Sequence, residues 1–360
     1  MHFDSLELRD LGWNSFFEGY FSGLGQAALV PARVVEELKG FHRVRSESGE
    51  YLAEIAGRVR YQAEGREDLP AVGDWVALAP RPEEGRARIE YILPRRTKLS
   101  RKVAGRSQGE QIVATNLDVV FVVSSLNREL NLRRIERYLT VAWDSGARPV
   151  VLLNKADLCI DADAWAADVE NVALGVPVYL LSAREGRGLE ALGKYFAQGE
   201  TAALIGSSGV GKSSIINALA RGQALRVQPV REGDDRGQHT TTSRQMIMLP
   251  GGGVVIDTPW MRELQLWDGD QGMGQAFEDI ETLARRCRFR DCSHRGEPGC
   301  EVEAAIANGL LDRERLENHR KLEAELRFQE RKQDPRLARE VKEEWKRIHK
   351  AMRHSKPDRP

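Results

Sequence analysis

Between residues 113 and 272, short hydrophobic runs alternate with stretches in which hydrophobic residues recur every three or four positions. The runs include D-V-V-F-V-V-S-S, P-V-V-L-L-N-K and T-A-A-L-I-G, and a segment such as L-R-R-I-E-R-Y-L-T-V-A has helical spacing. Buried strands that alternate with amphipathic helices are typical of a mainly parallel sheet with helices on both faces. The pattern therefore predicts an α/β domain over residues 113–272.

The flanking regions have different patterns. Residues 38–98 contain short alternating runs such as F-H-R-V-R-S and V-G-D-W-V-A-L, separated by Gly and Asp, which predict a small β-barrel. Residues 1–37 are rich in aromatic residues and predict an N-terminal arm that packs on a neighbouring domain. Residues 273–360 are helical in pattern, with clustered cysteines followed by highly charged segments, and predict a separate C-terminal domain.

Composition adds limits on partners and location. A chain of 360 residues with 41% hydrophobic content has room for two or three domains. The 54 basic residues balance the 54 acidic ones, so net charge by itself indicates neither a nucleic acid nor a membrane. The apolar runs are too short to cross a bilayer, and the first ten residues lack the pattern of a secretory signal. We expect a cytoplasmic protein without a membrane partner.

The strongest chemical motif is G-S-S-G-V-G-K-S-S, which follows an apolar run and opens a helical segment. Its glycines allow the backbone N–H groups to face a β-phosphate, as in the phosphate loops of nucleotide-binding proteins. Lys212 would bridge the β and γ phosphates as a catalytic cation, and Ser213 would ligate Mg²⁺. We expect the phosphates to contact Gly206, Ser207, Ser208, Gly209, Val210, Gly211, Lys212, Ser213 and Ser214.

Two later segments complete the expected Mg²⁺ site. The run V-V-I-D-T-P ends an apolar strand at Asp257, where a carboxylate can hold Mg²⁺ through water. Between this run and the phosphate loop lies G-Q-H-T-T-T-S, in which one hydroxyl from residues 240–242 would provide a further ligand. We take Thr241 as the representative of that threonine run.

The base is expected to be guanine. In N-K-A-D, Asp157 can accept hydrogen bonds from the guanine N1–H and amino group, which adenine does not present. Lys155 would cover the ring and Asn154 would tie neighbouring loops together. Ser182 and Ala183, in the S-A-R segment after the next strand, would offer a backbone N–H to guanine O6. These groups favour GTP and GDP over ATP, and so disfavour an ATPase.

The order of these motifs is unusual. The base-reading N-K-A-D and S-A-R precede the phosphate loop, the threonine run and D-T-P, which is a cyclic permutation of the usual GTPase order. A parallel sheet tolerates such a permutation when its original ends lie close together. The sequence therefore predicts a circularly permuted GTPase domain.

Three features occur together in residues 38–330: the permuted motif order, a barrel that contains V-G-D-W-V, and a cysteine cluster. In these features the chain resembles the RsgA family of circularly permuted GTPases, also called YjeQ or EngC. The resemblance implies that the barrel is an OB-fold. It also implies binding to the small ribosomal subunit and its rRNA late in assembly, with GTP hydrolysis stimulated by that subunit. We further expect a monomer.

One motif departs from the family. Where GTPases read D-x-x-G, this chain has Trp260 in place of glycine, and the next residue, Met261, cannot orient the attacking water. We take His239 as the candidate that positions this water, the alternative being an ordinary loop histidine. A second hypothesis follows from Trp260: a GTP-binding switch that docks on RNA and hydrolyses GTP poorly.

The last motif is a metal site. Cys287, Cys292, His294 and Cys300 offer three thiols and an imidazole within fourteen residues. Zinc favours tetrahedral sulfur and nitrogen ligands, and four protein ligands leave no open coordination position. The sequence therefore predicts one structural Zn²⁺ site in a C-terminal helical domain, as the family resemblance also implies.

Overall fold

The computed structural model describes residues 7–102, 110–126, 130–220, 244–257 and 270–333. The described residues form two compact units. The first runs to residue 257 and includes residues 271–278, and the second comprises residue 270 and residues 279–333. No helix among the described residues is both long enough and apolar enough to cross a membrane.

A five-stranded barrel occupies the N-terminal part of the first unit. Its strands are β1 (Val30–Glu37), β2 (His42–Ser46), β3 (Gly49–Ile55), β4 (Trp75–Arg81) and β5 (Arg86–Ile92). They pair in the order β1-β2-β3-β5-β4, and β4 pairs back to β1, which closes the barrel. Only the pairing of β3 with β5 is parallel. This closed five-stranded arrangement is that of an OB-like barrel.

The barrel begins earlier in the chain than the sequence pattern indicates, because β1 lies within the range assigned to the arm. Ala32 and Val34 in β1 are fully buried in the barrel core, so this strand is part of the closed sheet. The arm before it contains η1 (Leu8–Leu11) and α1 (Ser15–Gly23). Phe17 of α1 packs against Trp75 of β4 with ring centroids 5.7 Å apart, which anchors the arm on the barrel.

Short helical segments separate the barrel strands, and a two-stranded hairpin leads to the next domain. The segments are α2 (Gly57–Gln62), η2 (Arg66–Asp68) and η3 (Pro82–Glu84). The hairpin pairs β6 (Lys98–Lys102) with β7 (Glu110–Thr115) in antiparallel fashion.

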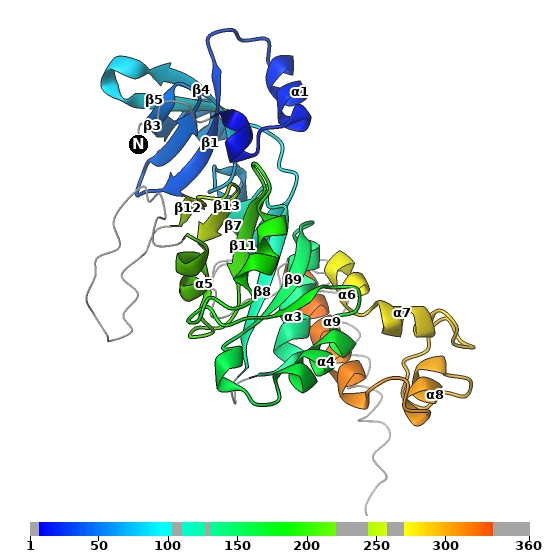
Figure 1. Ribbon diagram of the computed structural model, residues 1–360. Coiled ribbons are helices and arrows are strands. Elements are labelled where there is room, and N and C mark those ends of the chain that lie inside the picture. Colours follow the sequence, from blue (N-terminus) through cyan, green and yellow to red (C-terminus); the bar gives the residue numbers. More distant parts are fainter. Residues whose placement is uncertain (1–6, 103–109, 127–129, 221–243, 258–269, 334–360) are drawn as a thin grey trace, which may run out of the picture. The chain divides into compact units, whose positions relative to one another are not determined.

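A second set of strands forms the sheet predicted for residues 113–272. The strands are β8 (Val119–Ser125), β9 (Arg148–Asn154), β10 (Val178–Leu180), β11 (Thr201–Ile205), β12 (Gln245–Met248) and β13 (Val254–Asp257). They pair in the order β10-β9-β8-β11-β13-β12, and all pairs are parallel except β12 with β13. Figure 1 shows β8, β9 and β11 side by side, with β12 and β13 on the side of the barrel, where β12 pairs with β1.

Helices cover this sheet because its side chains alternate between two buried faces. The segments between the strands are α3 (Leu132–Asp144), η4 (Ala156–Leu158), α4 (Ala162–Val172), η5 (Leu189–Tyr195) and α5 (Lys212–Leu219), and α6 (Asp270–Ala276) follows the sheet. Phe121 of β8 packs in one core cluster with Tyr195 of η5 and Ile215 of α5. The helix α3 contacts β8 and β9, so the strands are buried between layers.

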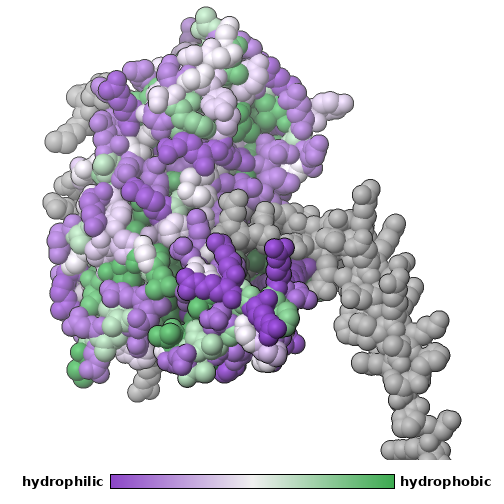
Figure 2. Space-filling view, turned by 90° about the vertical axis from the view of Figure 1, so that its right-hand side faces the viewer, coloured by the Kyte–Doolittle hydropathy of each residue, from purple (hydrophilic) through white to green (hydrophobic). Residues whose placement is uncertain are grey.

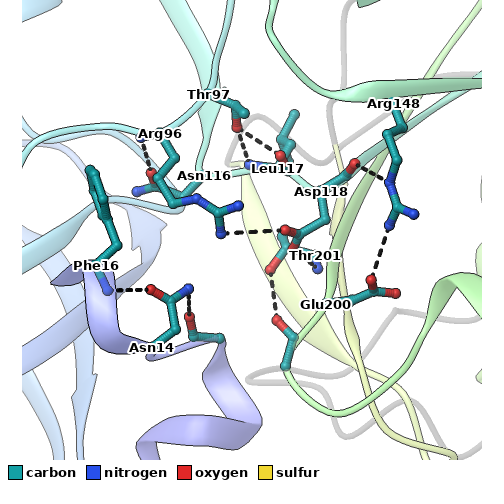
Figure 3. Close-up of polar contacts among 12 residues, drawn as sticks. Asn14, Phe16, Arg96, Thr97, Asn116, Leu117, Asp118, Arg148, Glu200 and Thr201 are labelled. Atoms are coloured by element: carbon teal, nitrogen blue, oxygen red, sulfur yellow. Dashed lines mark hydrogen bonds and ion pairs between the residues drawn. The ribbon is translucent and has the colours of Figure 1, made fainter. Parts of the chain in front are cut away.

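The barrel, the arm and the sheet meet at the amino ends of β8 and β11 (Figure 3). Asp118 accepts a hydrogen bond from the backbone N–H of Thr201 (2.9 Å) and forms an ion pair with Arg96 (3.6 Å). The buried side chain of Arg33 in β1 donates to Thr201 Oγ1 (2.8 Å) and to the carbonyl of Asn116 (3.1 Å). Burial lowers the pKa of Arg33 to about 10, while Asp118 and Asp74 act in the opposite direction. These contacts join the barrel to the sheet edge opposite the carboxyl ends of the parallel strands.

The second unit is helical. It contains α7 (Glu278–Ala284), α8 (Glu301–Ala307) and α9 (Arg313–Gln333). Arg315 of α9 forms a hydrogen-bonded ion pair with Asp279 (2.8 Å), and Ile280 and Leu316 are buried. Figure 2 shows one face of the molecule, on which hydrophilic residues predominate and hydrophobic residues lie in small groups between them.

Candidate nucleotide site and metal cluster

The phosphate loop connects the carboxyl end of β11 to the first turn of α5. Gly206, Gly209 and Gly211 all have positive φ, at 149°, 81° and 99°. A Cβ at Gly206 would overlap the carbonyl of Val123 in β8, and one at Gly211 would overlap the side-chain amide of Asn154. The loop is therefore held close to neighbouring strands, with its backbone curled before the helix as phosphate binding requires.

Lys212 and Ser213, the expected phosphate and Mg²⁺ contacts, are the first two residues of α5. The Lys212 ammonium donates to the carbonyl oxygens of Gly206 (2.7 Å) and Ser207 (2.8 Å). The ammonium group is therefore held against the backbone of the phosphate loop. Ser214 follows in the same first turn.

The segments expected to bind guanine lie at the carboxyl ends of the neighbouring strands. Asn154 ends β9 and is buried. Its side-chain amide donates to the carbonyl of Val210 in the phosphate loop (2.9 Å), and its Oδ1 accepts from the backbone N–H of Ala183 (3.0 Å). One side chain therefore connects the phosphate loop with the S-A-R segment. The Ala183 N–H, one of the backbone donors of the S-A-R segment expected near guanine O6, donates to Asn154.

Asp157 faces the same segment. A hydrogen bond from Ser182 lowers the pKa of the Asp157 carboxyl, and the nearby positive charges of Arg184 and Arg187 act in the same direction. Asp157 is therefore a carboxylate at neutral pH, as hydrogen-bond acceptance from guanine requires. Lys155, at φ 64°, adopts the left-handed conformation that starts the short η4 turn carrying Asp157.

The phosphate loop has two further contacts that the sequence motifs did not indicate. Arg134 of α3 donates to Ser207 Oγ (3.1 Å), and the Tyr138 hydroxyl lies 3.3 Å from the same oxygen. These residues lie more than sixty positions before the loop, and no local pattern links them to it. Their contact depends on how α3 packs against β8 and β9.

Several expected residues lie outside the described part of the chain: His239, Thr240, Thr241, Thr242, Trp260 and Met261. Asp257 is described and ends β13, next to β11, at the carboxyl edge of the sheet. Phosphate loop, N-K-A-D, S-A-R and Asp257 thus all follow the carboxyl ends of β11, β9, β10 and β13. Ligands of open α/β sheets bind at this edge.

The cysteine cluster is brought together in the second unit. The ligand atoms of Cys287, Cys292, His294 and Cys300 all lie within 4.8 Å of one another. His294 Nδ1 lies 3.6 Å from the Cys287 sulfur and 3.4 Å from the Cys300 sulfur. Three sulfurs and one imidazole nitrogen that converge in this way fit a tetrahedral Zn²⁺ site.

Other residues shape the loop that carries these ligands. His294 has φ 56°, and Arg320 of α9 donates to its carbonyl and to that of Ser293 (3.2 Å). Glu297 accepts hydrogen bonds from Ser293 (2.9 Å) and from the backbone of Arg295 (2.6 Å). The hydrogen bonds, with that from the Ser293 side chain largest, lower the pKa of Glu297 to about 2, so it accepts as a carboxylate.

Comparisons with known proteins agree with this geometry. A profile of the RsgA GTPase family matches residues 92–267. The small ribosomal subunit biogenesis GTPase RsgA of Opitutus terrae is 44% identical over 97% of this chain and 97% of its own length.

Solved structures are also similar. The crystal structure of YjeQ from Thermotoga maritima matches with a TM-score of 0.63 at 28% identity, over 83% of this chain and 98% of that one. The fold of YloQ, described as a circularly permuted GTPase, matches with a TM-score of 0.60 at 24% identity, over 83% of this chain and 96% of that one.

Proposed function

Because the chain belongs to the RsgA family and is a GTPase of ribosome biogenesis, we propose that it binds the small ribosomal subunit, through rRNA, late in assembly. In this proposal the subunit stimulates GTP hydrolysis, and the protein acts as a monomer in the cytoplasm. The name of the Opitutus terrae relative supports the small ribosomal subunit as the partner, and the family resemblance supports the timing and the stimulation.

The observation that carries the nucleotide assignment is the position of Asn154. Its side chain joins the Val210 carbonyl of the phosphate loop to the Ala183 N–H beside the expected base. A single buried residue thereby sets the spacing between the groups proposed for the phosphates and those proposed for guanine. Such a fixed spacing suits one nucleotide bound across the carboxyl edge of the sheet.

Each proposed contact follows from the chemistry of its residue. Residues 206–214 would bind the phosphates through backbone N–H groups and Lys212, and Asp157 would accept the guanine N1–H and amino protons. Ser213, Asp257 and a threonine of 240–242 would hold Mg²⁺, which supplies charge neutralisation at the phosphates. Lys155 would cover the base, and Ser182 holds Asp157 in its acceptor state.

The metal cluster would hold one Zn²⁺ through Cys287, Cys292, His294 and Cys300. A metal with four protein ligands has no open position for substrate, so its contribution is to hold the loop between α7 and α8 in one conformation. We propose that this module, like the barrel, contacts rRNA.

Hydrolysis is the proposed outcome of nucleotide binding, and His239 is proposed to position the attacking water. The competing hypothesis is a docking switch with little hydrolysis, which the replacement of glycine by Trp260 favours. The two differ in turnover, so the decisive experiment measures GTP hydrolysis with and without purified small subunits. Wild type, Trp260→Gly and His239→Ala are compared.

We expect wild-type turnover to rise strongly when subunits are added and His239→Ala to lose that rise. Turnover that stays at the basal rate for wild type but rises for Trp260→Gly would support the docking switch instead. An unchanged rise in His239→Ala would exclude the role proposed for that histidine.

A further inference from the structure

A cavity of about 590 Å³ opens between the barrel and the strands that lead into the nucleotide-binding sheet. Its walls come from α2 and the segment after it, from the ends of β1 and β2, from β7, and from Arg244 just before β12. None of these walls contains a residue proposed for GTP, Mg²⁺ or Zn²⁺. The cavity is therefore separate from both sites described above, and its volume is that of a typical small-ligand pocket.

The arginines at this cavity differ from the other arginines of the barrel. Arg60 of α2 and Arg66 of η2 line the cavity, and both are exposed. Among the described residues, neither side chain forms an ion pair or a hydrogen bond. Every other arginine from residue 38 to residue 98 pairs with a carboxylate: Arg43, Arg45, Arg58, Arg81, Arg86, Arg88, Arg95 and Arg96. The two unpaired cations thus meet at one place.

Deeper in the cavity, Arg244 has a different role. It donates to the Ile112 carbonyl (2.7 Å) and pairs with Glu37 (3.3 Å), and its side chain is largely buried. Burial lowers the pKa of Arg244; the charge of Glu37 opposes this, and those of Arg101 and Arg66 add to it. The cavity is lined by three arginines, Arg60, Arg66 and Arg244, and by two glutamates, Glu37 and Glu64, so its lining carries a net positive charge.

Apolar and polar groups complete the lining. Leu38, Ile55, Leu69 and Ile112 present apolar surface, and Gln111 offers an amide. His42 is buried and its Nε2 lies 3.2 Å from the carbonyl of Pro70, while Nδ1 has no hydrogen-bond partner among the described residues. The lining thus combines apolar walls for a planar ring with guanidinium groups that match phosphate geometry.

We propose that this cavity binds one unstacked nucleotide of single-stranded RNA, with the base between the apolar walls and the flanking phosphates on Arg60 and Arg66. Proteins recognise RNA sequence mainly at such splayed-out bases. Both arginines line the cavity and are exposed, so the phosphates of a polynucleotide can reach them from solvent. The inference rests on the proposed function, because it assigns a specific RNA contact to the barrel.

The test uses the full-length protein and a fluorescein-labelled, mixed-sequence RNA of about eight nucleotides, a length within the usual site size of such barrels. Binding is measured by anisotropy over a range of salt concentrations. The test variant is Arg60→Ala with Arg66→Ala. The control is Arg81→Ala with Arg86→Ala, which removes the same charge from exposed, carboxylate-paired arginines of the same barrel.

We expect the test variant to bind the RNA on the order of 10-fold more weakly. The slope of log affinity against log salt concentration should fall in magnitude by about 1.4, the value expected when two phosphate contacts on a single strand are lost. The control should change affinity by less than about 2-fold, because exposed ion pairs contribute little. A second variant, Ala63→Phe, keeps every charge but fills the cavity, and it should weaken binding as well.

Three results would overturn the proposal. The first is an equal loss of RNA affinity in the test and control variants, and the second is wild-type RNA affinity in Ala63→Phe. The third is displacement of the RNA by nucleoside monophosphates at the same molar concentration. The last result would indicate a site for free nucleotides. GTP hydrolysis with small subunits is measured in parallel. If RNA binding fails this test while subunits still stimulate wild-type hydrolysis, the cavity assignment is wrong and the proposed function stands.

Discussion

The side-chain amide of Asn154 donates to the carbonyl oxygen of Val210 at 2.9 Å, across fifty-six positions of sequence. The same amide lies where a Cβ on Gly211 would be placed. The N-K-A-D segment and the phosphate loop therefore interlock, because Asn154 fills the space that Gly211 leaves empty. Any side chain at residue 211 must displace this hydrogen bond.

Gly211→Ala should abolish tight GDP binding, because it combines a backbone at φ 99° with a clash against Asn154. Positive φ alone costs about 1–2 kcal/mol in a non-glycine residue. Gly209→Ala is the matched control, since Gly209 has φ 81° but open space around its Cβ position. Titration with fluorescent GDP should show a much larger loss of affinity for Gly211→Ala than for Gly209→Ala. Equal losses would mean that backbone strain alone explains both.

Asp157→Asn should change the base preference from guanine to xanthine. An asparagine presents an N–H donor that pairs with the xanthine C2 carbonyl, whereas it leaves the guanine amino group opposite a donor. Loss of the carboxylate should weaken GTP binding at least about 100-fold, and xanthosine triphosphate should bind better than GTP. Competition titrations with both nucleotides measure this ratio. A variant that still prefers GTP would contradict the role assigned to Asp157.

Arg320→Ala should weaken metal retention without removing a metal ligand. Arg320 donates to the carbonyls of Ser293 and His294, and it thereby holds His294 in its left-handed backbone conformation. Loss of such outer contacts commonly costs about 10–100-fold in metal affinity. Zinc release to a chromogenic chelator measures the effect. Arg313→Ala is the control, because that residue lies on the same helix but pairs with Glu303. Similar release from both variants would exclude a specific contribution of Arg320.

His42 should make the fold less stable in acid. Burial lowers the pKa of His42 from its ordinary value of 6.5, although Glu37 and the Pro70 carbonyl oppose the shift. As pH falls below about 6.5, the unfolded chain takes up a proton at this residue and the folded chain does not, so the free energy of unfolding decreases. His42→Gln should remove this part of the pH dependence.

Chemical unfolding of wild type and His42→Gln at pH 7.5 and 5.5 measures that difference. The quantity compared is the change in the free energy of unfolding between the two pH values, not the free energy itself. This comparison separates proton uptake at His42 from other titrating groups and from packing lost by the substitution. Identical pH dependence in both proteins would show that His42 is equally protonated in the folded and unfolded chains.

The sequence alone was sufficient to predict the fold class. The predicted circularly permuted GTPase domain, OB-like barrel and zinc-compatible helical module are confirmed by the strand order, the cysteine cluster and the similar structures. Motifs such as the phosphate loop and N-K-A-D can be predicted in this way because their function depends on backbone conformation over a few consecutive residues. Their order along the chain then indicates the permutation directly.

Tertiary structure decided what depends on contacts between distant segments. The strand β1 closes the barrel with β4 and also pairs with β12, and the strand's own sequence pattern does not reveal either partner. Arg134 reaches Ser207, and Arg60 and Arg66 meet at one cavity, only because packing brings separate elements together. An arginine has the same local signature whether it is paired or unpaired. Only its neighbours in the folded chain distinguish a solvated cation from one placed to bind a phosphate.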